Sequence, residues 1–263
     1  MVGSFEKWEG LGNDFVIIEV AGEHEWLEEA RVRDICERRR GVGADGVLFV
    51  ERAPAGSVTH GRMTVFNADG SRPEMCGNGL RCVAAYLAPE ASSSVLDIVT
   101  DDGVKRCFIE RASDSAEVTV EMGHASIGSD ETIQLGGDAH RFLRVATGNP
   151  HAITFERYDR TQIERIGPAV ERAIAGGANV EFAELEKDGI DVVVWERGVG
   201  FTLACGTGAC AVAAAACFTG RAEYDRPIRV KLPGGPLSIT VVKGTLAMRM
   251  RGPARLAFRG SFG

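Results

Sequence analysis

The sequence lacks long apolar runs, and no stretch approaches the roughly 20 residues that a membrane-spanning helix needs. Its first residues, Met-Val-Gly-Ser-Phe-Glu-Lys-Trp, also lack the apolar region of a secretory signal peptide. We therefore expect a cytoplasmic protein without a membrane partner.

Positive charge is not in excess, since 30 Lys and Arg stand against 37 Asp and Glu and leave a formal net charge of −7. Nothing in this balance favours nucleic acid as a partner. The seven cysteines are an odd number without a dense short-range framework, which fits a reduced compartment. At 263 residues and 44% hydrophobic content, the chain can form one large domain or two ordinary ones.

Two short segments are near copies of each other. Residues 74–85 read Glu-Met-Cys-Gly-Asn-Gly-Leu-Arg-Cys-Val-Ala-Ala, and residues 203–214 read Leu-Ala-Cys-Gly-Thr-Gly-Ala-Cys-Ala-Val-Ala-Ala. They share C-G-x-G-x-x-x-V-A-A, with Cys76 aligned to Cys205. The repeat indicates two thiols in equivalent surroundings.

Weaker repeats accompany these segments in the same order along the chain. They pair residues 12–16 with 148–152, 43–45 with 177–179, and 64–67 with 193–196. The period is far too long for a solenoid. We expect an internal duplication with two halves, 1–122 and 123–263, each carrying one cysteine motif, and the last ten or so residues able to return to the first half.

The local pattern predicts many strands and few helices. Strands are expected at 15–20, 46–51, 62–67, 96–100, 105–110, 117–121, 152–155, 180–184, 190–196, 228–232, 237–242 and 245–251, with hairpin turns at 102–103 and 243–244. Helices are expected at 25–40, 79–87, 160–175 and 208–219. The arginines at 38–40 would complement the dipole of the first helix, which would end at Gly41.

The helices after the two cysteines are almost wholly apolar or alanine-rich, which is typical of buried helices. The predicted fold class is therefore α/β (α+β). Each pseudo-symmetric half would be a curved, mostly antiparallel sheet wrapped around a central helix.

A cysteine at the start of a helix suits proton transfer. Its pKa of roughly 8.5 can be lowered by the helix amides or by a nearby cation. Those amides also form an anion site, here at Gly77, Asn78, Gly206 and Thr207, which could hold a carboxylate. Two thiols on opposite sides of the adjoining carbon would invert it. The sequence thus predicts two-base racemisation or epimerisation without a cofactor.

Plainer interpretations of the cysteines stay open. A small cysteine at a helix start can simply pack, and two facing thiols can oxidise to an inactive disulfide. Zinc is disfavoured because the cysteine spacing is wrong and no histidine follows at ligand distance. Three other cysteines, Cys36, Cys107 and Cys217, are expected to be ordinary core residues.

Longer motifs give a specific resemblance. They are Gly-Leu-Gly-Asn-Asp-Phe (10–15, preceded by Lys7), Gly-Val-Gly-Ala-Asp-Gly (41–46), Phe-Asn-Ala-Asp-Gly-Ser (66–71), the two cysteine motifs, Gly-Asn-Pro-His (148–151), Asn-Val-Glu-Phe (179–182), Trp-Glu-Arg-Gly-Val-Gly (195–200) and Leu-Pro-Gly-Gly-Pro-Leu (232–237). With these motifs in this order, the chain resembles a diaminopimelate epimerase along essentially its whole length.

The resemblance implies roles for individual residues. Cys76 and Cys205 would be the acid/base pair, and the four amides named above would hold the reacting α-carboxylate. The implied substrate-binding side chains are those of Asn13, Asn67, Asn149, Asn179, Glu196 and Arg197. His151 and Glu196 would assist proton traffic at the thiols.

The resemblance also implies the reaction and its setting. LL-diaminopimelate would be converted to the meso form, in the route to lysine and peptidoglycan, without pyridoxal phosphate or a metal. The implied fold has two pseudo-symmetric α/β halves that close over an amino-acid substrate, and a homodimer is expected. Two positions depart from the family pattern: Gly46 stands where some relatives have glutamine, and Phe201 where a polar residue is common.

Alternatives remain for the residues and for the function. The asparagines could be turn formers or strand-end caps, Arg197 a solvated surface residue, and His151 a structural histidine. Competing functions are a proline or hydroxyproline racemase, a redox-sensing or thiol-exchange protein, and a non-catalytic binding module. A distal amino-acid group on the substrate, which the asparagines and Arg197 would read, favours diaminopimelate over proline.

Overall fold

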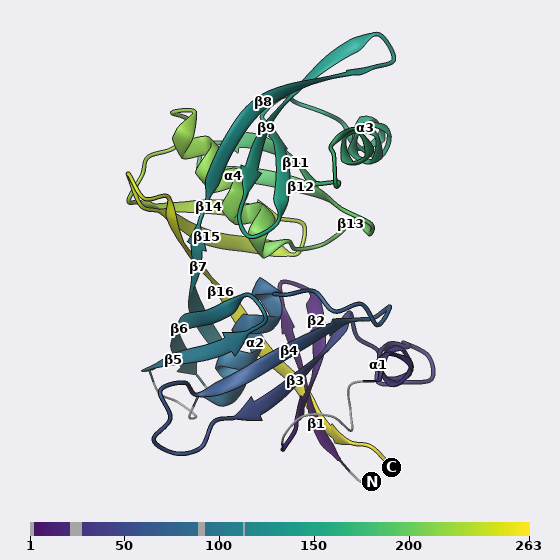
Figure 1. Cartoon of the computed structure of the whole chain (residues 1–263), viewed down its shortest axis with the longest axis vertical. Helices are drawn as coiled ribbons and strands as arrows, with labels where there is room; N and C mark the ends of the chain where they lie inside the picture. Colours follow the sequence, from purple (N-terminus) through teal and green to yellow (C-terminus); the bar gives the residue numbers. More distant parts are fainter. Residues whose placement is uncertain (1–2, 22–27, 89–92, 113) are drawn as a thin grey trace. The chain divides into compact units, whose positions relative to one another are not determined.

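The computed structural model describes residues 3–21, 28–88, 93–112 and 114–263. The chain folds into two compact units (Figure 1). Unit 1 comprises Met1–Val120 together with Gly252–Gly263, and unit 2 comprises Glu121–Arg251. Whether the predicted halves 1–122 and 123–263 are domains that fold separately stays a prediction.

Unit 1 is a sheet that closes on itself around a helix. Its strands are β1 (Ser4–Gly10), β2 (Asn13–Glu19), β3 (Gly46–Arg52), β4 (Gly61–Asn67), β5 (Ser93–Thr100), β6 (Gly103–Ala112), β7 (Ser115–His124) and the end of β16 (Ala247–Ser261). They are neighbours in this order, and β1 also pairs with β16. Helix α2 (Gly77–Leu87) contacts β1, β2, β3, β4 and β6 from within this ring (Figure 1).

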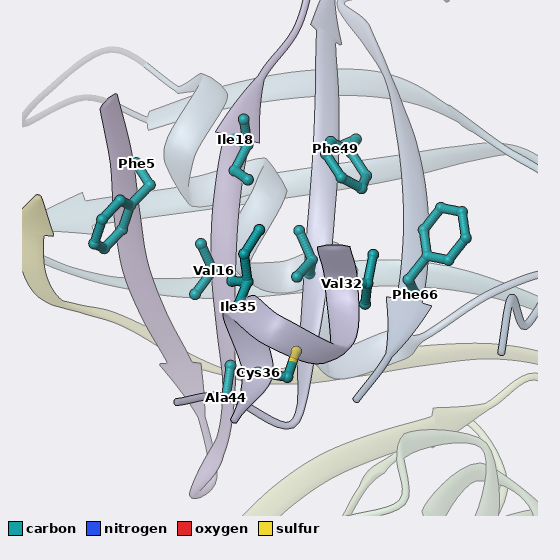
Figure 2. Close-up of a cluster of buried hydrophobic side chains, with 10 residues drawn as sticks. Phe5, Val16, Ile18, Val32, Ile35, Cys36, Ala44, Phe49 and Phe66 are labelled. Atoms are coloured by element: carbon teal, nitrogen blue, oxygen red, sulfur yellow. The ribbon is translucent and has the colours of Figure 1, made fainter. Parts of the chain in front are cut away.

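The other face of the unit 1 sheet carries helix α1 (Glu29–Cys36). Figure 2 shows its buried side chains, Val32 among them, packed against Val16 and Ile18 of β2 and Phe49 of β3. Successive residues of a strand point to opposite faces, so the intervening residues of β2 and β3 face α2. The sheet therefore lies between a short outer helix and a buried central one.

Unit 2 repeats this plan. Its strands are β8 (Ser126–Leu135), β9 (Asp138–Ala146), β10 (Pro150–Thr154), β11 (Asn179–Glu186), β12 (Gly189–Glu196), β13 (Gly200–Phe201), β14 (Pro227–Leu232), β15 (Gly235–Val241) and the start of β16. The order is β16-β15-β14-β12-β11-β10-β9-β8, with β13 beside β12. Helix α4 (Gly206–Phe218) is the buried central helix and α3 (Arg160–Ala173) the outer one.

The predicted fold class is confirmed, with a sheet wrapped around a central helix in each unit. All the predicted strands exist, but β1, β8, β9 and β13 were not predicted. The predicted first helix is wrong at its end, because α1 stops at Cys36 and not at Gly41; its predicted start at 25–27 lies outside the described residues. No helix in the described part of the chain is long and apolar enough to cross a membrane.

The early end of α1 has a local cause. The carboxylate of Glu37 accepts hydrogen bonds from the backbone amides of Arg39, at 2.7 Å, and of Arg40. These bonds offer the backbone a turn in place of another helical turn. The arginines at 38–40 therefore do not form the last turn of a helix.

Candidate functional site

Cys76 is the N-cap of α2. Its backbone is extended, with φ −135° and ψ 112°, and its sulfur accepts a hydrogen bond from the amide of Gly79 at 3.4 Å. Gly77 and Asn78 follow as the first residues of the helix and are buried. The Cys76 side chain is only half-buried, so the thiol is accessible within unit 1.

Cys205 caps α4 in the same way. Its backbone angles are φ −122° and ψ 107°, and its sulfur accepts from the amide of Gly208, again at 3.4 Å. The hydroxyl of Thr207 lies 3.5 Å from the sulfur. The sequence repeat thus corresponds to a repeated cap, in which each thiol meets the first turn of a central helix.

The two thiols differ in their surroundings. Cys205 is buried, and burial raises its pKa well above the usual value, with the charges of Glu196 and Glu181 acting in the same direction. Hydrogen bonds from Thr207 and Gly208 oppose this shift without overcoming it. The Gly208 amide thus lowers the pKa of Cys205 as expected, but burial outweighs it and the net shift of the pKa is upward.

Glu196, at the end of β12, lies beside this thiol. Burial raises its pKa, and hydrogen bonds with Thr202 and Cys205 act against that shift. The Thr202 hydroxyl lies 2.6 Å from Glu196 Oε1 and donates to it. A carboxyl group with a raised pKa next to a thiol can exchange a proton with it.

His151, in β10, is fully buried and held from both sides. Its Nδ1 lies 2.7 Å from Glu181 Oε1, and its Nε2 lies 2.8 Å from Asn149 Oδ1. A carboxamide oxygen can only accept, so Nε2 is the donor to Asn149. Glu181 is also fully buried, and its Oε2 has no hydrogen-bond partner among the residues the structure describes.

Two more of the predicted residues of unit 2 are linked to each other. The amide of Arg197 donates to Asn179 Oδ1 at 2.9 Å, and the exposed Arg197 guanidinium donates to the carbonyl of Gly176 at 2.8 Å. Asn179 begins β11 beside His151 in the parallel ladder between β10 and β11. The structure therefore places the predicted residues of unit 2 around the ends of β10, β11 and β12 and the start of α4.

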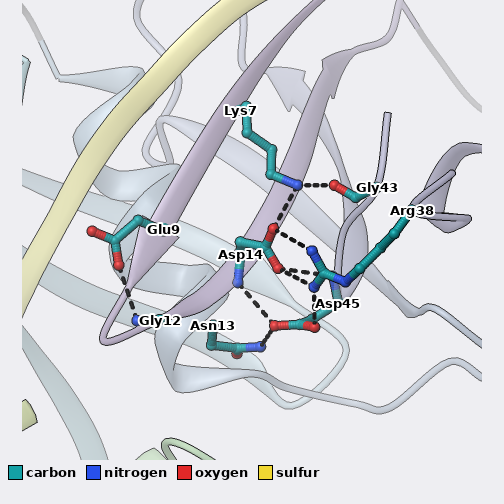
Figure 3. Close-up of polar contacts among 8 residues, drawn as sticks. All are labelled: Lys7, Glu9, Gly12, Asn13, Asp14, Arg38, Gly43 and Asp45. Carbon is teal, nitrogen blue, oxygen red and sulfur yellow. Dashed lines mark hydrogen bonds and ion pairs between the residues drawn. The ribbon is translucent and has the colours of Figure 1, made fainter. Parts of the chain in front are cut away.

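In unit 1, Asn13 lies next to the start of α2. Its Oδ1 accepts from Asn78 Nδ2 at 3.2 Å, and its Nδ2 donates to Asp45 Oδ2 at 2.9 Å. Figure 3 shows Asn13 beside Asp45. The carboxamide of Asn13 is thus fixed on both sides.

Asp45 belongs to a charged cluster. Arg38 bridges Asp14 and Asp45 at 2.8 and 2.7 Å, and the buried Lys7 lies 2.7 Å from Asp14 and donates to the carbonyl of Gly43 (Figure 3). Burial alone would raise the pKa of Asp14, but the hydrogen bonds from Arg38 and Lys7 outweigh it and lower the pKa. Arg38 is therefore part of an ion-pair cluster that positions Asp45, and not the dipole-complementing helix end that was predicted.

Asn67 is not joined to the Asn13 group by a hydrogen bond. It is exposed at the end of β4, and its Nδ2 donates to Ser71 Oγ at 2.9 Å. Gly46 leaves no room for a side chain, since a Cβ there would lie 2.5 Å from the carbonyl oxygen of Phe66. Phe201 packs edge-on against Trp195, with ring centroids 5.3 Å apart.

The cysteines predicted to be core residues are buried. Burial raises the pKa of Cys36 to about 11, of Cys107 to about 12 and of Cys217 to about 11. Within the described ranges, no group of three or more His, Cys, Asp or Glu side chains is arranged to hold a metal ion.

Glu181 and Asp45 lie within the quoted motifs, but no role was predicted for either of them. The sequence does contain a sign of the role of Glu181, because this charged residue stands inside the otherwise apolar stretch Val180–Ala183. Charged residues are almost never fully buried unless they are paired. A carboxylate at that position therefore predicts a buried partner, which the structure identifies as His151.

Comparisons with known proteins agree over nearly the whole chain. The family model described as diaminopimelate epimerase matches residues 5–128 and 143–257. A diaminopimelate epimerase of Gloeothece citriformis is 39% identical over 279 residues, covering 98% of this chain and 98% of the relative. One of Desulforudis audaxviator is 39% identical over 280 residues, with the same coverage of both chains.

Solved structures share the fold at lower identity. A hydroxyproline epimerase from Agrobacterium vitis, with bound trans-4-hydroxy-L-proline, superposes with a TM-score of 0.76 at 16% identity, covering 99% of this chain and 92% of that one. A PhzF-family phenazine biosynthesis protein from Bacillus anthracis gives 0.76 at 15% identity and covers 100% and 99%. These likenesses show the two-unit fold alone.

Proposed function

The chain belongs to the diaminopimelate epimerase family, and from that premise we propose that Cys76 and Cys205 are the two acid/base groups of its reaction. The activity is the epimerisation of diaminopimelate, which serves lysine biosynthesis. The substrate that we propose is LL-2,6-diaminopimelate, converted to the meso form, a precursor of peptidoglycan as well as of lysine.

One observation carries the proposed pair. Each thiol is the N-cap of a buried central helix, and each accepts a 3.4 Å hydrogen bond from the second glycine of its motif. Residues that only packed at a helix start would not need the same cap in both units. The equivalence supports one chemical task carried out twice, once by each thiol.

Proton transfer would use both thiols on the same carbon. One thiolate removes the α-proton, and the other thiol donates a proton to the opposite face, so the configuration at that carbon inverts. The amides of Gly77 and Asn78 and those of Gly206 and Thr207 are the proposed donors to the α-carboxylate. Donors aimed at that group stabilise the negative charge that develops as the proton leaves.

The surroundings of Cys205, burial above all, favour one protonation state of its thiol. Because burial raises its pKa, with Glu196 and Glu181 adding to the effect, the protonated form of Cys205 is favoured, which suits this thiol to donate the proton to the opposite face. We propose that Glu196 and His151 assist proton transfer to and from Cys205. The far end of the substrate would be read by Asn13, Asn67, Asn149, Asn179 and Arg197, with Glu196 beside them.

The test is solvent exchange. Proton NMR of LL-diaminopimelate in D₂O with reduced protein should show deuterium entering the α-position as the meso isomer appears. Cys76→Ala and Cys205→Ala should each lower turnover at least ~100-fold, because one thiol cannot serve both faces. Cys217→Ala, a thiol outside both caps, should retain activity. Near-normal turnover in Cys76→Ala or Cys205→Ala would refute the two-base mechanism. The same exchange experiment with trans-4-hydroxy-L-proline tests the alternative substrate.

We also propose a cofactor-free, cytoplasmic homodimer. The resemblance of the chain to the diaminopimelate epimerase family supports all three statements. Activity should survive EDTA and a carbonyl trap such as aminooxyacetate, and light scattering should give twice the mass of the chain. Loss of activity with either reagent, or a monomeric mass, would contradict the corresponding statement.

A further inference from the structure

The two units place different residues at one equivalent position. In unit 1, the parallel ladder between β2 and β3 pairs Phe15 with Gly46. In unit 2, the ladder between β10 and β11 pairs His151 with Asn179. Phe15 therefore corresponds to His151. The weak sequence repeat had instead aligned Asn179 with the residue before Gly46, one position away.

Two residues further along each second strand, Leu48 corresponds to Glu181. The contacts of the central helices agree with this. A Cβ added to Gly79 of α2 would meet Leu48 Cδ2 at 3.0 Å, whereas one added to Gly208 of α4 would meet Glu181 Oε1 at 2.7 Å. The same glycine of each cysteine motif thus faces leucine in one unit and a carboxylate in the other.

The fold does not need a polar pair at this position. Phe15 and Leu48 fill it in unit 1 with apolar side chains that are buried, as His151 and Glu181 are in unit 2. A buried ion pair adds little net stability compared with apolar residues of similar volume, because both groups lose their hydration. The pair in unit 2 therefore calls for a functional explanation.

That explanation follows from the chain of hydrogen bonds. Glu181 holds Nδ1 of His151, and Nε2 of His151 donates to Oδ1 of Asn149. With its oxygen engaged, the carboxamide of Asn149 has its NH₂ group left to donate. Among the described residues, none accepts a hydrogen bond from that group. Asn149 is only half-buried, so a bound ligand can reach it.

We propose that Glu181 is a positioning residue for substrate binding, acting through His151 to keep the NH₂ group of Asn149 turned toward a substrate carboxylate. This inference rests on the proposed function, which assigns Asn149 to substrate binding. Glu181 is fully buried, so its effect on a bound substrate would pass through His151.

The role predicts a contrast between two variants. Glu181→Leu removes the partner of His151 Nδ1, so the ring and the Asn149 carboxamide lose their fixed orientation. Loss of the Asn149 hydrogen bond to a substrate carboxylate should raise KM roughly 10- to 100-fold, and the accompanying loss in kcat, through His151 and the Cys205 thiol, should be smaller than the rise in KM. Glu181→Gln can still hydrogen-bond to Nδ1 and should stay within about fivefold of wild type. Glu186→Leu, at an exposed position of the same strand, is the matched control.

A double-mutant cycle tests the route. If Glu181 acts through Asn149, Asn149→Ala combined with Glu181→Leu should be no worse in kcat/KM than Asn149→Ala alone. The proposal would be overturned if the kcat/KM losses of the two single variants multiplied in the double variant. It would also be overturned if Glu181→Gln were as impaired as Glu181→Leu, which would mean that charge and not orientation matters.

Two further outcomes separate this proposal from its neighbours. The Tm of the double variant His151→Phe/Glu181→Leu should not fall below that of the Glu186→Leu control, since phenylalanine and leucine occupy the equivalent positions in unit 1; a large fall would indicate a structural role of the pair and overturn the proposal. If Glu181→Leu keeps the wild-type KM while the cap variants of Cys76 and Cys205 are inactive, only the role of Glu181 is refuted. If the cap variants stay active, the proposed function itself has failed.

Discussion

At the scale of single residues, the two thiols share a cap but not an environment. Cys76 is half-buried, while Cys205 is buried and has a raised pKa because of that burial and the nearby carboxylates. The thiolate is the form that reacts with electrophiles, and each pKa unit is a factor of about 10 in its amount. The symmetric motif therefore produces two chemically different thiols.

Iodoacetamide should distinguish them. Without substrate at pH 7.5, we expect Cys76 to be alkylated about 10-fold faster than Cys205 or more. Mass spectrometry of proteolytic peptides would measure the two rates. Because the pKa of Cys205 is raised, its labelling should accelerate only as the pH rises well above the usual pKa of a thiol. Equal rates at pH 7.5 would show that the surroundings of Cys205 do not keep it protonated.

The charged cluster around Asp14 predicts a pH-dependent stability. Folding lowers the pKa of this carboxyl from its usual 3.8, so its ionised form is the one that the folded protein stabilises. That contribution is complete above about pH 4 and is lost as the pH falls toward the lower folded-state pKa. Asp14→Asn should therefore lower the free energy of unfolding by about 2 kcal/mol at pH 7, because it leaves the buried Lys7 without its carboxylate.

Urea denaturation at pH 7 and pH 3 would measure this effect. The difference between Asp14→Asn and wild type should narrow at pH 3. The control is Asp191→Asn, whose ion pair with Lys231 is exposed and should contribute less than about 1 kcal/mol at either pH. A difference for Asp14→Asn that does not change with pH would mean that its charge is not the source of the stability.

At the scale of elements, the starts of α2 and α4 respond differently to one methyl group. Alanine in place of Gly208 would place a Cβ 2.7 Å from Glu181 Oε1, an atom that the bond to His151 holds. Alanine in place of Gly79 would meet the end of Leu48 at 3.0 Å, which can rotate away. We expect Gly208→Ala to cost about 1–3 kcal/mol of stability and Gly79→Ala distinctly less.

Thermal unfolding of both variants, together with an activity assay of each, would test the expected difference in stability. Gly208→Ala should also raise KM, since it displaces the carboxylate that orients His151. A larger loss of stability in Gly79→Ala than in Gly208→Ala would contradict the packing argument.

Elements with a marked apolar pattern were predictable, and those without one were not. The two central helices were predicted to within two residues because they are apolar all round and follow a glycine turn. β8 was missed because most of its residues are exposed, so it carries no apolar run. Its place comes from the antiparallel pairing with β9, a tertiary interaction that local sequence does not encode.

The candidate site was predictable where its residues recur in both halves or follow the family pattern, as Cys76, Cys205, Asn13 and Asn149 do. The partners that hold these residues were not. Asp45 and Arg38 become neighbours of Asn13 only after β2 and β3 pair, and the Glu181–His151 contact needs the pairing of β10 with β11. Local sequence also cannot show that burial outweighs the helix amides in setting the pKa of Cys205.

At the scale of the whole molecule, the end of the chain belongs to unit 1 and not to the unit that precedes it. β16 pairs with β15 of unit 2 over Met248–Arg251 and with β1 of unit 1 over Arg255–Ser261. The buried Arg81 of α2 donates to the carbonyl of Pro253 at 3.1 Å. Both termini are therefore required to close the sheet of unit 1 (Figure 1).

Removing residues 252–263 should accordingly open one unit and spare the other. β1 would lose one of its two partner strands, and Arg81 of α2 would lose the Pro253 carbonyl, so amide hydrogen exchange should become fast across β1 to β4 and α2. The strands from β11 to β15 and helix α4 should stay protected, because none of their pairings uses the deleted residues. A synthetic peptide of residues 252–263 should restore protection in unit 1, which controls for general damage. Loss of protection in both units would show that unit 2 depends on unit 1, and unchanged exchange in β1 would show that the strand from the C-terminus does not hold the ring closed.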